Sequence, residues 1–386
     1  MAKDKRILIV SSKWPGKTNS SDGGNSTVRE LIEMLKDDYS IDILYFGENR
    51  ESAPQDGIDK VLDIACDYDH YEKYSKGNES KFIIRLRQAD MSAREIEKYN
   101  ASYDRIIVIH TMFLMGINPN NSYLLNKVIL FPMFTGIDYR KCGEQVPDEY
   151  MLLEKNIMKK VGALVVPSKR EKETLTQMYD VNEERVHVIH RCVDRFRYQE
   201  HILSSDKTIE ILFIASIRMQ KAHIDSIILL RKLIDYGLDV KLLCIGAIQD
   251  KEIHFECLKE AKELNVDDRV IFTGNMEYDE LATIISKADV NISVSQWETF
   301  GRGIFEGMAA GIPTLVLSRL DVIKDITSSG NSPIICDDLE EMACKIKQLY
   351  YNPDAYFIET QKGKILRNEF STCAVKEQLI NVLDWS

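Results

Sequence analysis

The chain has 386 residues, of which 44% are hydrophobic, and a formal net charge of −11. This length suits two domains of roughly two hundred residues better than one core. The acidic excess lies in residues 201–386, with 29 acidic and 20 basic side chains, which excludes a general nucleic-acid binder because that function needs a basic face.

The sequence contains neither an apolar run of about 18 residues nor a basic-then-apolar leader, which predicts a protein without a spanning helix or signal peptide. We therefore expect a cytoplasmic protein. The eight cysteines are scattered without a Cys-x-x-Cys pair and are interpreted as reduced thiols that form no disulfide and bind no metal. Asp67 and Asp69 form an Asp-x-Asp pair, which we interpret as an acidic surface loop rather than a metal site.

The first half of the chain begins with a buried-strand pattern at residues 6–10, a polar loop and a helical pattern at residues 26–35. Gly23 and Gly24 lie in the loop. Adjacent glycines between a first strand and a first helix allow the backbone to approach a ligand closely, although a plain flexible loop is the alternative. Further strands are predicted at residues 41–46, 105–109, 127–131 and 161–168, and a helix at 169–179.

A basic, partly amphipathic stretch covers residues 80–96, where four cationic side chains lie beside apolar ones. Such a stretch is typical of a helix that contacts a membrane surface or an anionic acceptor. An ordinary surface helix is the alternative. His110 follows a predicted strand and would lie at the rim of the first sheet, where a functional and a structural role are both open.

The second half alternates short apolar strands, predicted at residues 209–215, 240–245, 270–272 and 290–294, with helical stretches, as a parallel sheet requires. Residues 339–350 and 374–383 are predicted to be terminal helices. After the strand at 290–294 comes a polar loop and then a short helix whose apolar residues share one face. Gly311 ends this helix and Pro313 prevents its continuation. The free N–H groups near Gly301 and Gly303 predict an anion site.

Two carboxylates, Glu298 and Glu306, frame this predicted anion site. Eight helical steps would separate them by ~12 Å, whereas the carboxylate pairs of glycosidases lie roughly 5 to 9.5 Å apart. They suit the two ends of a long ligand, such as a sugar joined through a diphosphate to a ribose. The alternative is a solvated loop carboxylate and a separate carboxylate on the helix surface.

The run Glu298-Thr-Phe-Gly-Arg-Gly-Ile-Phe-Glu306, followed by Gly-Met-Ala-Ala-Gly-Ile-Pro, resembles the E-x7-E signature of retaining, nucleotide-sugar-dependent glycosyltransferases of family four. The resemblance implies the GT-B architecture, an α/β fold of two doubly wound Rossmann-like domains facing a central crevice. Residues 1–197 would form the acceptor-side domain and residues 198–370 the nucleotide-sugar-binding domain. Residues 371–386 would form a C-terminal helix that packs back on the first domain.

The resemblance also assigns roles to individual residues. The segment Ser216-Ile-Arg-Met-Gln-Lys221 resembles the family pattern whose Arg and Lys hold the donor diphosphate, which implies that role for Arg218 and Lys221. Glu298 would contact the transferred sugar and Glu306 the ribose hydroxyls. The implied donor-binding residues are Gly23, Gly24, Asn275, Met276, Phe300, Gly301, Arg302, Gly303 and Glu306. The implied acceptor-side residues are His110, Asp138 and Arg140.

The resemblance implies a transferase that needs neither a metal nor another cofactor and prefers a UDP-sugar as donor. The acceptor would be a glycan, a lipid-linked molecule or a protein, in cell-surface polysaccharide or glycoconjugate synthesis, with possible peripheral contact at the inner face of the membrane. The chain departs from the family pattern at Ser216, Met133 and Cys192. These departures leave open a non-catalytic partner subunit of a glycosyltransferase pair. A nucleotide-sugar epimerase or hydrolase, which could use the same two-domain crevice, is a second alternative.

Overall fold

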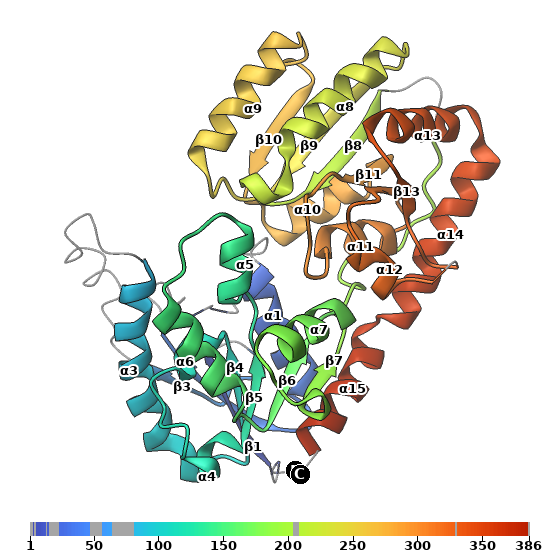
Figure 1. The fold of residues 1–386 in the computed structure, drawn as a ribbon. Helices are drawn as coiled ribbons and strands as arrows, with labels where there is room; N and C mark the ends of the chain where they lie inside the picture. Colours follow the sequence, from blue (N-terminus) through green and yellow to red (C-terminus); the bar gives the residue numbers. More distant parts are fainter. Residues whose placement is uncertain are drawn as a thin grey trace. The chain divides into compact units, whose positions relative to one another are not determined.

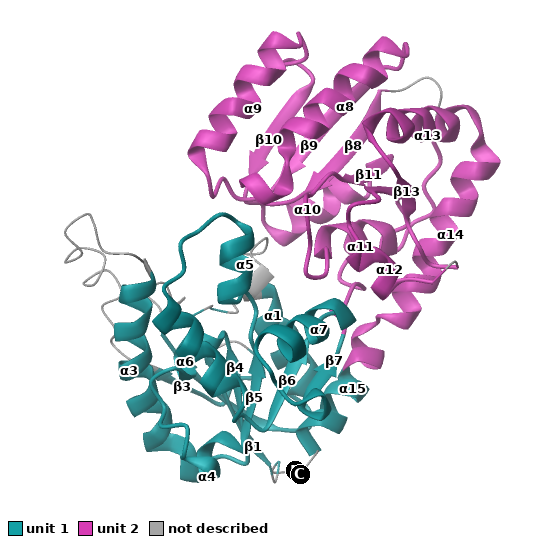
Figure 2. Cartoon of the chain, viewed as in Figure 1, with its two compact units in different colours: residues 1–16, 23–189, 376–386 teal, residues 17–22, 190–375 magenta. Residues whose placement is uncertain are grey.

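The computed structural model describes residues 3, 5–12, 14, 23–46, 56–63, 81–203, 208–328 and 330–384. These residues form two compact units (Figure 2). Unit 1 holds the described residues up to Ile189 together with those from Lys376 onward, and unit 2 holds those between His190 and Val375. Asp67 and Asp69 lie outside the described residues.

Unit 1 contains a parallel sheet, which within the described residues has seven strands in the order β3-β2-β1-β4-β5-β6-β7 (Figure 1). Its strands are β1 (Arg6–Ser11), β2 (Ser40–Tyr45), β3 (Lys60–Asp63), β4 (Arg105–Ile109), β5 (Val128–Phe131), β6 (Ala163–Val166) and β7 (Val186–Val188). Its helices are α1 (Gly23–Leu35), α3 (Lys81–Tyr99), α4 (Ser122–Leu125), α5 (Gly136–Lys141), α6 (Asp148–Met158) and α7 (Lys169–Met178). The strand order reverses between β1 and β4, where ligands bind in sheets of this kind.

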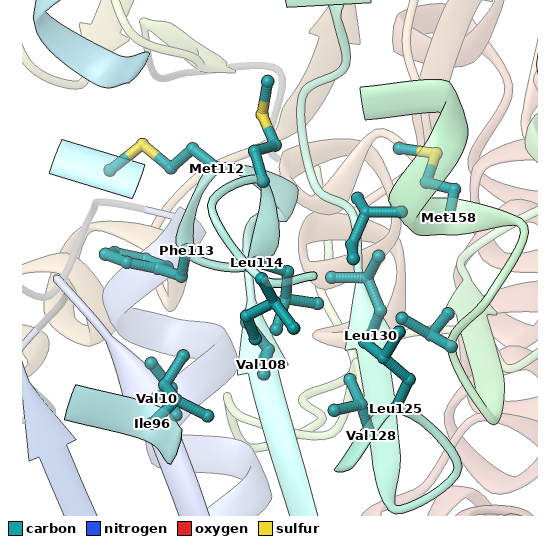
Figure 3. Close-up of a cluster of buried hydrophobic side chains, with 14 of the residues drawn as sticks. Val10, Ile96, Val108, Met112, Phe113, Leu114, Leu125, Val128, Leu130 and Met158 are labelled. Atoms are coloured by element: carbon teal, nitrogen blue, oxygen red, sulfur yellow. The ribbon is translucent and has the colours of Figure 1, made fainter. Parts of the chain in front are cut away.

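The strands of unit 1 are nearly continuous apolar runs because helices cover both faces of the sheet. Ile9 on β1 lies opposite Ile43 on β2 and Ile107 on β4, and all three are fully buried. On one face, Val108 and Leu130 pack with side chains from the helical segments, including Ile96 and Phe113 (Figure 3). This core fixes the carboxyl ends of β1 and β4.

Unit 2 contains a second parallel sheet, with six strands among the described residues in the order β10-β9-β8-β11-β12-β13. Its strands are β8 (Ile209–Ile214), β9 (Val240–Ile245), β10 (Val270–Gly274), β11 (Val290–Ser293), β12 (Thr314–Leu317) and β13 (Ile334–Cys336). Its helices are α8 (His223–Asp235), α9 (Lys251–Glu263), α10 (Tyr278–Ile285), α11 (Arg302–Ala309), α12 (Val322–Ile326), α13 (Leu339–Tyr351) and α14 (Pro353–Glu369). The strand order reverses between β8 and β11, which follow one another in the sheet but not in the chain.

The last helix, α15 (Thr372–Asp384), begins in unit 2 and ends in unit 1. Its Lys376 pairs with Asp38, and Arg105 donates a hydrogen bond to the carbonyl of Leu383 at 2.8 Å. The two parallel sheets covered by helices confirm the predicted α/β class of two doubly wound, Rossmann-like units.

Two further findings concern the described residues as a whole. Their seven cysteines are all free thiols. No helix among them has the length and apolar character needed to cross a lipid bilayer.

Candidate active site

The loop after β8 carries Lys221 at the point where the strand order of unit 2 reverses. It ends in a 3₁₀ turn, η5 (Met219–Lys221), and Ala222 then adopts left-handed backbone angles, with φ +51° and ψ 47°. An L-residue with a Cβ adopts this conformation at a cost that glycine would not incur. The left-handed residue reverses the chain, so that α8 begins at His223, two residues after Lys221.

The loop after β11 carries Glu298 and leads directly into α11. Gly301, the residue before this helix, has a φ of +90°, which favours glycine. A Cβ on Gly303 would lie 2.3 Å from the carbonyl oxygen of Ile214, the last residue of β8. Glycine at this position therefore lets the first turn of α11 lie directly against the end of β8, and the backbone N–H groups of that turn lie at the same sheet edge as Lys221.

Lys221 and Glu298 come together at this edge although 77 residues separate them in the chain. The Nζ of Lys221 lies 2.6 Å from Oε1 of Glu298, and their side chains are only 12% and 10% exposed. An ion pair held away from water interacts strongly, but each partner depends on the other because an isolated charge there is costly. The resemblance indicated both residues, and the structure brings them into direct contact.

Gln220 ties the two loops together. Its backbone carbonyl accepts a hydrogen bond from the N–H of Gln296 at 2.8 Å. Its side-chain Nε2 donates to the carbonyl of Trp297 at 2.7 Å. These bonds fix the backbone immediately before Lys221 to the backbone immediately before Glu298. No sequence pattern signalled this role.

Glu306 lies in the second turn of α11 and is 3% exposed, with the Nη1 of Arg302 3.8 Å from its Oε1. Asn291, a fully buried residue of β11, contacts the first turn of α11. Its Nδ2 donates to the carbonyls of Gly303 at 3.2 Å and Ile304 at 3.3 Å. Glu306 is thus held near a cation on a helix whose position is fixed by two strands.

His223, the first residue of α8, is fully buried and its ring lies 4.6 Å from that of Phe213. Burial lowers the pKa of His223 to about 4, because the charged imidazolium loses its hydration. The imidazole is therefore neutral at physiological pH. The positive charge near the loop after β8 is carried by Lys221 and Arg218.

The other predicted donor-side residues differ in their surroundings. Arg218 is half-buried and directly precedes η5. Asn275 is exposed and Met276 half-buried after β10, where Gly274 has a φ of +70°. The ring of Phe300 is 3% exposed and packs 4.9 Å from that of Phe305 in the apolar cluster beneath α11. That packing makes Phe300 a support for the helix.

In unit 1, the prediction that Gly23 and Gly24 lie in a loop was wrong, because they are the first two residues of α1. His110 follows β4 with φ +90° and ψ 129°, an uncommon conformation for a residue with a Cβ. Its Nδ1 accepts a hydrogen bond from the N–H of Met112 at 3.2 Å, which places the proton of a neutral ring on Nε2. Met133 also has a positive φ, of 61°.

Asp138 and Arg140 both lie on α5. Asp138 is buried, whereas Arg140 is exposed to solvent. Asp138 is fully buried, and its Oδ2 accepts hydrogen bonds from the N–H and Oγ1 of Thr135 in a capping box. Arg140 is exposed and pairs with Asp148 at 2.9 Å. These contacts serve the helix cap and the surface, and an acceptor contact for either residue stays a prediction.

Buried carboxyl groups surround the cap of α5. Glu154 is fully buried and accepts hydrogen bonds from the N–H of Gly136 at 2.8 Å and the hydroxyl of Tyr179 at 2.5 Å. Burial raises its pKa to about 7. Burial, together with the charge of Asp138, raises the pKa of Glu171 to about 8. No group of three or more His, Cys, Asp or Glu side chains in the described part of the chain is placed to hold a metal ion.

Comparison with known families identifies the part of the chain that holds the Lys221–Glu298 pair. Residues 194–364 match the family model described as "Glycosyl transferases group 1". This part of the chain is therefore similar to the group 1 glycosyl transferases. The match spans the described strands β8 to β13 and therefore contains both loops of the candidate active site.

Two curated relatives each match about half of the chain. N-acetyl-alpha-D-glucosaminyl L-malate synthase from Bacillus anthracis is 25% identical over 195 residues, which cover 50% of this chain and 48% of that protein. The O-antigen chain mannosyltransferase RfbU from Salmonella typhimurium is 23% identical over 206 residues, covering 53% of this chain and 56% of that protein. The chain thus spans about half the length of these relatives.

Solved structures match over nearly the whole chain. Sucrose-phosphate synthase from Thermosynechococcus elongatus has a TM-score of 0.74 and 17% identity, with 98% of each chain covered. The Anabaena protein Alr3699/HepE, solved in complex with UDP, has a TM-score of 0.72 and 15% identity, with 98% of this chain and 99% of that chain covered. At these identities the likeness establishes the fold. The chain thus has the GT-B fold, and residues 194–364, which match the family model, lie in its second unit.

Proposed function

We propose that this protein is a retaining glycosyltransferase that moves a sugar from a nucleotide-sugar donor to a glycan, lipid-linked or protein acceptor. The observation that carries the proposal is the Lys221–Glu298 pair, 2.6 Å apart at the switch point of the second sheet and beside the start of α11. A cation, a carboxylate and the backbone N–H groups of a helix start at one edge suit a ligand with a diphosphate and a hydroxylated sugar.

The diphosphate of the donor binds to Lys221, to Arg218 and to the amide groups of residues 301–303. In the structure, Nζ of Lys221 donates a hydrogen bond to Oε1 of Glu298. Donor binding therefore exchanges a lysine–carboxylate bond for a lysine–phosphate bond and releases the carboxylate to the sugar. Glu306, held eight residues further along on α11, binds the ribose hydroxyls at the other end of the donor.

In the reaction, the bond between the anomeric carbon and the diphosphate oxygen breaks, and its electron pair leaves with the nucleoside diphosphate. The acceptor hydroxyl oxygen forms the new bond from the same face of the sugar, and its proton passes to the departing phosphate oxygen. Lys221, Arg218 and the start of α11 stabilise the charge on the leaving group. Glu298 stabilises the positive charge that builds up on the sugar ring.

These residues supply the positive charge that a leaving diphosphate needs, so the proposal includes transfer without a metal ion. A UDP-sugar is the favoured donor, supported by the Anabaena structure solved with UDP. Synthesis of a cell-surface polysaccharide or glycoconjugate, in the cytoplasm and with peripheral contact at the membrane, is supported by the likeness to an O-antigen mannosyltransferase.

The proposal is tested by screening UDP- and GDP-sugars for stabilisation of the protein, and then by assaying transfer with and without acceptor glycans and glycolipids. We expect a glycoside product with the anomeric configuration of the donor, formed equally well in EDTA. Turnover that needs no acceptor would instead identify a hydrolase or epimerase. Failure of every nucleotide sugar to bind would indicate a non-catalytic subunit. Loss of activity in EDTA that magnesium or manganese restores would refute the metal-free mechanism.

A further inference from the structure

Arg319 joins three neighbouring segments at the carboxyl edge of the second sheet. It follows β12 by two residues, and β12 lies next to β11. Its Nε donates to the carbonyl of Ser295 at 3.1 Å, and its Nη2 donates to the carbonyl of Val294. The same Nη2 lies 2.6 Å from Oδ2 of Asp225. One guanidinium group therefore contacts two carbonyls and a carboxylate.

The partners of Arg319 belong to the two segments that carry the Lys221–Glu298 pair. Val294 and Ser295 begin the loop that holds Glu298, and Asp225 lies in the first turn of α8, four residues after Lys221. Arg319 and Asp225 are 34% and 28% exposed, so solvent screens their pair only in part. A planar guanidinium fixes several acceptors in one geometry, which a lysine ammonium does not.

We propose that Arg319 is a positioning residue that sets where Glu298 stands relative to Lys221. This inference rests on the proposed glycosyltransferase function. Arg319 does not touch Glu298 itself; it acts through the backbone of the loop and through α8. The bonds of Gln220 hold the far side of the same loop, so loss of Arg319 leaves the loop attached but displaced. A displacement of about 1 Å of a catalytic group can lower a rate by 10²-fold.

Three variants test the inference. Arg319→Gln removes both the charge and the planar guanidinium, and Arg319→Lys keeps only the charge. Asp225→Asn weakens only the ion pair between Arg319 and α8. The matched control is Arg231→Gln, because Arg231 forms an ion pair with Asp235 on the solvent face of α8. Each protein is measured for kcat and donor KM, for the Kd of UDP, for melting temperature and for amide hydrogen exchange of residues 294–301.

We expect Arg319→Gln to lower kcat by tenfold or more, to change the UDP Kd by less than threefold and to speed exchange of residues 294–301. Arg319→Lys and Asp225→Asn should lie between this variant and the control, which should match the parent. An unchanged kcat in a folded Arg319→Gln variant overturns the inference, whether or not exchange becomes faster. A lower kcat with unchanged exchange also overturns it. A parent protein that turns over no nucleotide sugar would overturn the proposed function itself.

Discussion

Replacement of Lys221 by methionine is the most direct test of the site, because it removes the charge and keeps the apolar length of the side chain. The lost charge-assisted hydrogen bond to a donor phosphate is worth about 1.5–3 kcal/mol. That corresponds to a Kd for the nucleoside diphosphate weakened by roughly 10- to 150-fold. The assay is calorimetric titration of UDP.

The same substitution should also destabilise the fold. Glu298 has only 10% of its side chain exposed, and without the partner 2.6 Å away its charge would be left nearly buried. Removal of one partner from a buried pair costs about 3–5 kcal/mol, and we expect the lower end of that range here because both side chains retain some exposure. The double variant Lys221→Met/Glu298→Gln should recover part of the loss. Urea unfolding measures all three proteins.

Lys232 provides the matched control for this experiment. It forms an ion pair with Glu340 at the same 2.6 Å distance, but these side chains are 36% and 52% exposed. Because exposed pairs contribute little, Lys232→Met should leave both stability and the UDP Kd close to those of the parent. If Lys221→Met behaved like this control in both assays, Lys221 would be a surface lysine and the derivation of the site would fail.

Three further predictions concern other residues. Glu298→Gln should lower kcat by roughly 10²-fold without weakening UDP binding, whereas Glu306→Gln should mainly raise the donor KM. The reverse pattern would mean that the donor binds in the opposite orientation, with its ribose at Glu298 and its sugar at Glu306. Gly303→Ala should cost about 1–3 kcal/mol of stability, since its Cβ would lie 2.3 Å from a β8 carbonyl, and a loss no larger than that of Gly330→Ala would contradict the close contact. Because burial raises the pKa of Glu154 to about 7 from an ordinary 4.5, folded Glu154 binds a proton that the unfolded chain releases, and stability falls as pH rises through this window. Glu154→Gln should remove that part of the fall in urea titrations at pH 4.5 to 8, and parallel curves for parent and variant would show that the group does not titrate there.

Much of the fold was predictable because the sequences of buried parallel strands are short apolar runs, separated by the more polar sequences of helices. The run at residues 240–245 coincides with β9, and the helix expected before Gly311 is α11. The strands that were missed are short. β3 and β12 have four residues each, β7 and β13 have three each, and β12 directly follows Pro313. Helix α14 was missed because its exposed and buried apolar residues do not concentrate on one face.

The site was predictable only where local sequence carries the chemistry. The resemblance indicated Lys221 and Glu298, and glycines marked the helix start that approaches β8. The roles of Gln220 and Arg319 were missed because both side chains hold the loop through its backbone carbonyls. Every residue has a backbone carbonyl, so the loop sequence does not show which ones are bound. The burial of Phe300 was also not predictable from the sequence, since nothing in the residues around it showed that its ring packs beneath α11.

The path of α15 determines the order in which the two units can be completed during synthesis. Its last part supplies the buried side chains Leu379 and Leu383 and the residue that pairs with Asp38, all within unit 1. The ribosome makes these residues only after it has made the whole of residues 190–375. Although protein domains generally fold in order from the amino terminus, this amino-terminal unit stays unfinished until the carboxyl-terminal unit has emerged. Throughout the second half of translation, the nascent chain therefore exposes the apolar surface of unit 1 that α15 later covers.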